Sequence, residues 1–99
     1  MTPEAFRAAA LAIRGVEARP HMDRTAFRAR INFATLAADG ATANVKLPAE
    51  EQELHCERLA GVTPVSGGWG RMGWTTVDLA RVSDDDIAVL LSAAHRNAL

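Results

Sequence analysis

The sequence Gly67-Gly68-Trp69-Gly70-Arg71-Met72-Gly73-Trp74-Thr75-Thr76 contains both tryptophans of the chain and four of its seven glycines. Glycine allows positive φ angles and close backbone approach, whereas tryptophan supplies a large flat contact surface. The stretch therefore predicts a tight loop that leads into a strand. From Trp74 to Leu79 the residues alternate between two sets of every second position (two parities). Thr75, Val77 and Leu79 form one set, as expected for a strand with one buried face.

Earlier segments alternate in the same way. In residues 24–33 one parity holds Phe27, Ala29, Ile31 and Phe33, and the other holds Arg24, Ala26, Arg28 and Arg30. Because this run is long for one strand, we expect a turn or bulge near Arg30–Asn32. Asp39-Gly40 predicts a hairpin turn before a strand over Ala41–Leu47, and Val62–Val65 is a candidate edge strand.

Three helices are expected around these strands. The first begins at Pro3, with Thr2 as its cap, and ends near Gly15; the second runs from Pro48 to about Leu59; the third follows Ser83, with Asp86 in its first turn. Residues 17–23 are expected to form a connection, because Pro20 lacks an N–H donor. The order of elements predicts one α+β domain over residues 1–99, with an antiparallel sheet and the helices on one of its faces.

Composition limits the possible partners. The net charge is −1 and the pI is about 6.3, so no global positive field attracts nucleic acid or an anionic membrane. The basic residues are ten arginines and Lys46. The single cysteine, Cys56, excludes an internal disulfide, and no leader or long apolar run is present, so we expect a cytoplasmic location without a membrane role.

Motifs for catalysis or cofactors are weak. Gly68-x-Gly70-x-x-Gly73 has the spacing of a dinucleotide fingerprint, but it precedes a strand rather than opening a long helix. His55 and Cys56 are neighbours on a helix and point about 100° apart, which does not suit a shared metal. The aspartates from Asp84 to Asp86 are best explained as the start of a helix. We therefore expect no enzyme activity, no cofactor and no metal.

Several segments together resemble the MmcQ/YjbR family. They are Gly15-Val16-Glu17, Arg19-Pro20-His21, Thr25-Ala26-Phe27-Arg28, Phe33-Ala34-Thr35-Leu36, Val45-Lys46-Leu47 and Gly73-Trp74-Thr75-Thr76-Val77. The resemblance runs from about Glu4 to the last helix. It implies a fold like CyaY, the bacterial frataxin, and a function as a DNA-binding protein. Frataxin-like iron binding is not implied, because the first helix offers only Glu4 where that function uses an acidic helix.

One surface remains as a candidate binding site. By parity, the open face of the sheet carries Arg24, Arg28, Arg30, Lys46 and Trp74, and the glycine stretch adds Trp69 and Arg71 at its rim. Arginines beside an exposed aromatic residue can contact phosphates and stack on bases, so nucleic acid is one expected partner. A protein partner or a small ligand is another, because Trp and Arg dominate binding hot spots. A solvated face whose arginine stems shield Trp74 is the third possibility.

Overall fold

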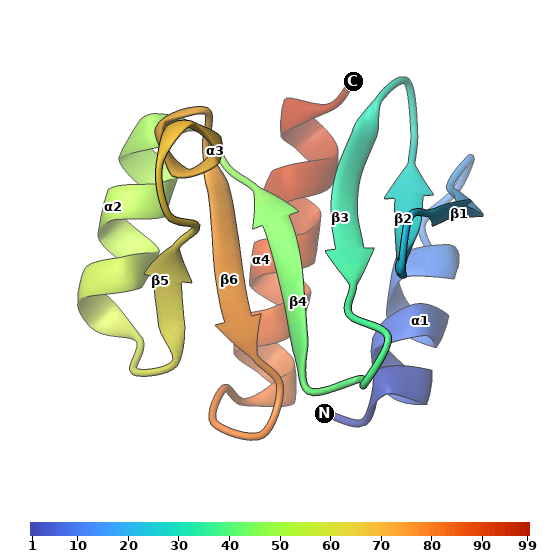
Figure 1. Ribbon diagram of the computed structural model, residues 1–99, viewed down its shortest axis with the longest axis horizontal. Coiled ribbons are helices and arrows are strands. Elements are labelled where there is room, and N and C mark those ends of the chain that lie inside the picture. Colours follow the sequence, from blue (N-terminus) through green and yellow to red (C-terminus); the bar gives the residue numbers. More distant parts are fainter.

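Six strands form one antiparallel sheet in the computed structural model, which describes residues 1–99 (Figure 1). Their order across the sheet is β1-β2-β3-β4-β6-β5. The strands are β1 (Glu17–His21), β2 (Arg24–Arg28), β3 (Asn32–Leu36), β4 (Thr42–Lys46), β5 (Val62–Pro64) and β6 (Trp74–Asp78).

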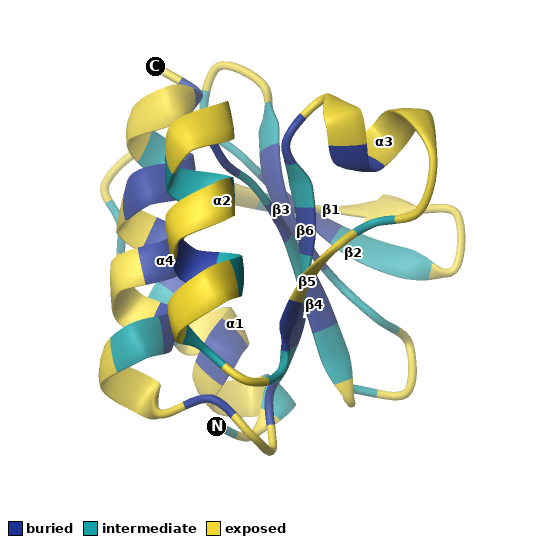
Figure 2. Cartoon of the chain, turned by 90° about the vertical axis from the view of Figure 1, so that its left-hand side faces the viewer, coloured by how far each residue is buried: buried dark blue, intermediate teal, exposed yellow.

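Three helices cover one face of this sheet. They are α1 (Pro3–Leu11), α2 (Ala49–Arg58) and α4 (Asp84–Asn97), and Figure 2 shows them together on one side. Thr2 and Ser83 cap α1 and α4 by accepting hydrogen bonds from the backbone N–H groups of Ala5 and Asp86, as their sequences predict. The core of 18 buried residues lies between these helices and the sheet. The predicted α+β class, with terminal helices on one face, is confirmed. None of the helices has both the length and the apolar character that crossing a membrane requires.

A bulge in β3 adjusts the alternation that the sequence predicts. Phe27 pairs with Ala34 while Arg28 pairs with Asn32, so Phe33 is the extra residue between them. Phe33 and Ala34 consequently both belong to the buried core, although they are sequence neighbours. The expected turn near residues 30–32 is confirmed. Arg30, however, is exposed in that turn, so its predicted place on a strand of the open face is wrong.

The expected connection over residues 17–23 is also wrong. Residues 17–21 form β1, an edge strand that pairs with β2 from Glu17↔Arg28 to His21↔Arg24. Pro20 fits because an edge strand has one side without a sheet partner, where a missing N–H donor costs nothing. Met22 and Asp23 form the two-residue turn between the strands.

The glycine stretch contains one turn of helix, α3 (Gly68–Arg71), where the sequence predicts a loop. This turn lies on the side of the sheet opposite to α1, α2 and α4 (Figure 2). The predicted strand that follows is confirmed as β6, with Thr75 and Val77 buried and Trp74 and Thr76 half-buried. The three covering helices leave this second face of the sheet open, and α3 lies at one end of it.

Candidate functional site

Small polar side chains occupy the middle of the open face. Thr35 pairs with Asn44, and Asn44 pairs with Thr76, so these residues form a row across β3, β4 and β6. The hydroxyl of Thr76 donates a hydrogen bond to Asn44 Oδ1 at 2.9 Å. Because these side chains are short, the centre of the face is lower than its surroundings.

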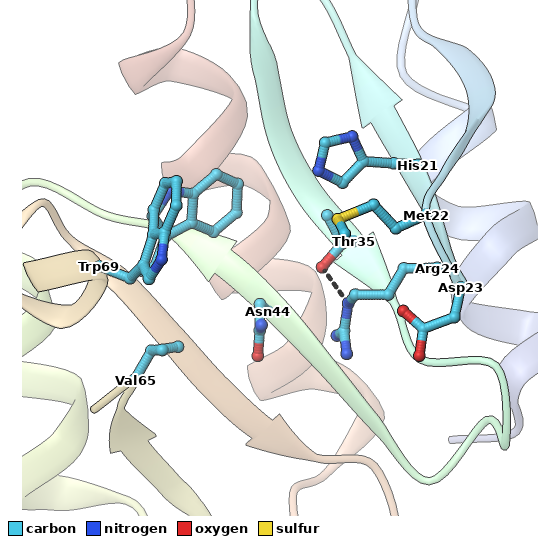
Figure 3. Close-up of a pocket in the computed structure, with 9 residues that line it drawn as sticks. His21, Met22, Asp23, Arg24, Thr35, Asn44, Val65 and Trp69 are labelled. Atoms are coloured by element: carbon cyan, nitrogen blue, oxygen red, sulfur yellow. Dashed lines mark hydrogen bonds between the residues drawn. The ribbon is translucent and has the colours of Figure 1, made fainter. Parts of the chain in front are cut away.

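Larger side chains rise on both sides of this row and create a groove of about 270 Å³. One wall holds Val65, Trp69 and Trp74, from the β5–α3–β6 segment, and the opposite wall is the β1–β2 hairpin tip (Figure 3). The complete lining is His21, Met22, Asp23, Arg24, Thr35, Asn44, Val65, Trp69 and Trp74.

The tryptophan wall is fixed by close backbone packing that only glycine permits. A Cβ atom on Gly70 would lie 1.9 Å from the carbonyl oxygen of Val65, and one on Gly73 would lie 2.1 Å from that of Leu47. Gln52 of α2 adds a polar tether, because its Nε2 donates to the carbonyl oxygen of Gly70 at 2.9 Å and to that of Trp74 at 3.2 Å. The glycines that match a dinucleotide fingerprint are thus explained by packing, and they set the position of both tryptophans.

The hairpin wall contains an unfavourable backbone conformation. Met22 is the only non-glycine residue with positive φ, at 58°, and it occupies the first position of a two-residue turn. Glycine is favoured at such a position because a Cβ atom crowds the backbone there. Met22 is also 93% exposed, so no burial offsets the strain. Strain of this kind is concentrated at binding sites, which makes the methionine a candidate contact residue.

Arg24 is the only cationic residue that lines the groove. Its Nε donates to Thr35 Oγ1 at 2.9 Å, which holds the side chain against the floor (Figure 3). One terminal nitrogen, Nη2, is covered from solvent and has no hydrogen-bond partner. Arg24 takes part in none of the ion pairs of the molecule. The other terminal nitrogen, Nη1, makes no hydrogen bond either and is not closed off from solvent, so an acceptor that enters the groove can meet the guanidinium there.

The structure separates the residues that the sequence groups into one site. Arg24, Trp69 and Trp74 line the groove. Arg28 and Lys46 lie on the open face but outside the groove, paired in register with Glu17 and Trp74 respectively. Arg71 is exposed on α3 and does not line the groove. Arg30 does not line the groove either, because it lies in the β2–β3 turn.

The sequence interpretation missed the hairpin wall because it treated residues 17–23 as a connection. The sequence signal for this hairpin is weak, because proline is rare within strands and Met22-Asp23 is not a typical turn pair. Asn44 lies in the strand predicted over Ala41–Leu47, but nothing in the sequence pairs it with Thr35. That pairing depends on the sheet order, which periodicity alone does not determine.

Two further residues belong to the opposite, helix-covered side. His55 is buried, and its Nδ1 accepts a hydrogen bond from Arg58 Nε at 3.0 Å. Burial, and then the charge of Arg58, lower the pKa of His55, so the imidazole is held neutral. Burial raises the pKa of the Cys56 thiol, which keeps it protonated. No three or more His, Cys, Asp or Glu side chains cluster in an arrangement that could hold a metal ion.

Comparison with known proteins extends these observations. A family model described as YjbR matches residues 11–97 of the chain. The fold is similar to that of a crystal structure of a protein from Pseudomonas syringae, a structural-genomics target, with 15% identity, a TM-score of 0.77 and coverage of 100% of both chains. No curated protein is similar to the chain at a significant level.

Proposed function

The chain belongs to the YjbR family, and from that premise we propose that it is a non-enzymatic, cytoplasmic domain that binds single-stranded nucleic acid through the groove on its open sheet face. The observation that carries the proposal is the groove itself, in which Trp69 and Trp74 face a hairpin tip that presents Met22 and Arg24. The DNA-binding function that the family resemblance implies supports the same class of partner.

The walls suit a flat ring. Indole faces stack on any base, and each such contact contributes about 1–3 kcal/mol in single-strand binders. The flexible thioether of Met22 adapts to a ring that enters opposite Trp69. Bases in a duplex are paired and stacked inside the helix, so a narrow groove of about 270 Å³ favours an unpaired base.

Positive side chains near the groove suit the backbone of the same strand. Arg28 and Lys46 lie on the open face, and Arg71 is exposed on α3. Their charges act locally, because the whole chain carries a net charge of −1. We expect two or three phosphate contacts, for which the affinity should fall roughly tenfold between about 50 and 200 mM salt.

A protein partner is the second candidate, and one observation favours it. Met22 and Trp69 are 93% and 63% exposed, and they lie on the two walls of one groove rather than scattered singly over the surface. Trp and Arg are also common anchors of protein interfaces. Such binding would bury both residues without a steep dependence on salt, so salt dependence separates the two candidates.

The test is a fluorescence titration, since both tryptophans line the groove and the chain has no other Trp and no Tyr. A thymine dodecanucleotide should quench the emission, and a duplex of equal length should bind more weakly. Trp69→Ala should weaken binding at least fivefold, which corresponds to the loss of about 1 kcal/mol of stacking. Leu54→Ala is the matched control, because Leu54 is 54% exposed on α2, outside the groove. Absence of binding at the lower salt, or equal binding by Trp69→Ala and Leu54→Ala, would overturn the proposal.

A further inference from the structure

The floor of the groove is rich in hydrogen-bond donors. Asn44 Oδ1 already accepts from the Thr76 hydroxyl, and Asn44 Nδ2 makes no hydrogen bond within the molecule. Thr35 Oγ1 accepts from Arg24, which leaves the hydroxyl hydrogen of Thr35 free to donate. The Nη1 nitrogen of Arg24 makes no hydrogen bond within the molecule and, unlike Nη2, is not closed off from solvent, so it adds a third group without an acceptor. Three neighbouring side chains therefore have hydrogen-bond donors that no acceptor within the molecule satisfies.

Acceptors are scarce at the same depth. The amide oxygen of Asn44 and the hydroxyl oxygen of Thr35 each already accept one hydrogen bond, and the only carboxylate in the lining, Asp23, lies on the exposed hairpin turn. His21 also lies at this rim and is exposed. A ligand edge that reaches the floor consequently meets donors, and it must present acceptors to satisfy them.

The same surroundings argue against a simple anion. Arg24 is the only cation in the lining, and the carboxylate of its neighbour Asp23 belongs to the same hairpin wall. Most of the wall is apolar, with Val65, Met22 and the two indoles, so a phosphate would lose hydration for one ion pair. A planar ring with carbonyl oxygens at its edge satisfies both the apolar walls and the donor-rich floor.

We infer that the groove selects an oxo-substituted heteroaromatic ring over one that carries an amino group at the same edge, with Asn44 as the main specificity-determining residue. The ligand class rests on the proposed function, since such rings in nucleic acid are thymine, uracil and, through its O6/N7 edge only, guanine. A free nucleoside has the same chemistry, and the experiment separates the two sources. An amino group directed at the floor would place donor against donor, and a mismatched edge of this kind weakens base recognition by roughly 5- to 150-fold.

The experiment uses a matched pair of ligands. Two heptanucleotides carry a single central base, hypoxanthine or adenine, between abasic sugars, so their phosphates are identical and no base stacks on another. The two purines differ only at C6 and N1: hypoxanthine has a carbonyl beside an N1–H, and adenine has an amino group beside an N1 lone pair. At the C6/N7 edge, where both have the N7 acceptor, the carbonyl and the amino group are the only difference. We expect the hypoxanthine ligand to bind the intact chain about tenfold more tightly by tryptophan quenching. Asn44→Ala should reduce this ratio to below threefold, whereas Thr63→Val, an exposed open-face change outside the groove, should preserve it.

The outcomes separate this inference from the proposed function. Equal binding of the two heptanucleotides, or an unchanged ratio in a folded Asn44→Ala variant, overturns the selectivity while leaving nucleic-acid binding in place. Free inosine and free adenosine form the second arm. If neither heptanucleotide binds but inosine quenches the tryptophans more strongly than adenosine, the selectivity stands and the nucleic-acid proposal fails. If no ligand of either arm binds, both fail.

Discussion

Replacing Gly70 by alanine should displace the tryptophan wall of the groove. The new Cβ atom would lie 1.9 Å from the carbonyl oxygen of Val65, whereas real Cβ contacts are essentially never shorter than 3.0 Å. The α3 turn must therefore move by roughly 1 Å or more. This shift disturbs the Gln52 hydrogen bond to Gly70, worth about 0.5–1.5 kcal/mol, and repacks a tight contact at a cost of about 1–3 kcal/mol. We expect a total loss of about 2–4 kcal/mol.

Gly68→Ala is the matched control, since Gly68 lies in the same helical turn. A Cβ atom there would meet only the terminal nitrogen of Arg71, at 3.6 Å, which is an ordinary contact. This variant should be neutral or slightly more stable, because alanine favours helix by about 0.5–1 kcal/mol. Thermal melting should place Gly70→Ala about 10–25 °C below Gly68→Ala. If the two variants melt within about 3 °C of each other, glycine packing does not hold the wall in place.

Three further predictions concern the other side chains that hold the groove and the fold. Met22→Gly should stabilise the chain by about 1 kcal/mol in urea unfolding, because it relieves positive φ, yet it should weaken ligand binding; a loss of stability would contradict the strained turn. Gln52→Ala should cost about 1–2 kcal/mol in the same assay and broaden the indole NMR signals of the groove, and an unchanged spectrum would show that the tether is dispensable. The pKa of His55 is lowered in the folded chain, so below the ordinary histidine pKa of 6.5 the unfolded chain binds more protons than the folded one. The stability should therefore be fully present above that pH and decline as the pH falls. His55→Gln should flatten this decline between about pH 7 and pH 5, and an equally steep decline in the variant would exclude His55 as the cause.

The fold was largely accessible from the sequence because its periodic signals agree with its packing. The caps at Thr2 and Ser83, the Asp39-Gly40 turn and the alternation in β4 and β6 each correspond to an observed element. These features are local, since a cap or a turn depends on a few neighbouring residues. Local chemistry of this kind can be read directly from residue order.

The errors occur where tertiary pairing overrides local preference. An edge position lets Pro20 occupy β1 without loss of a sheet hydrogen bond, which no local rule indicates. The bulge at Phe33 changes the parity within β3. Arg30 leaves its expected face for another reason, because β2 ends at Arg28 and Arg30 lies in the turn that follows. The groove was only half predicted for the same reason: Trp69, Trp74 and Arg24 stood out by residue type, whereas Met22 and Asn44 became site residues through the sheet order.

The most direct test of the account is the location of bound nucleic acid, followed by NMR during titration with a thymine oligonucleotide at about 50 mM salt. We predict that the largest shifts involve the two indole N–H signals and the amides of Met22, Arg24 and Asn44, because these residues line one groove. Shifts confined to α1 and α4 on the opposite side of the sheet, or no shifts at saturating ligand, would contradict the assignment of the open face as the binding surface.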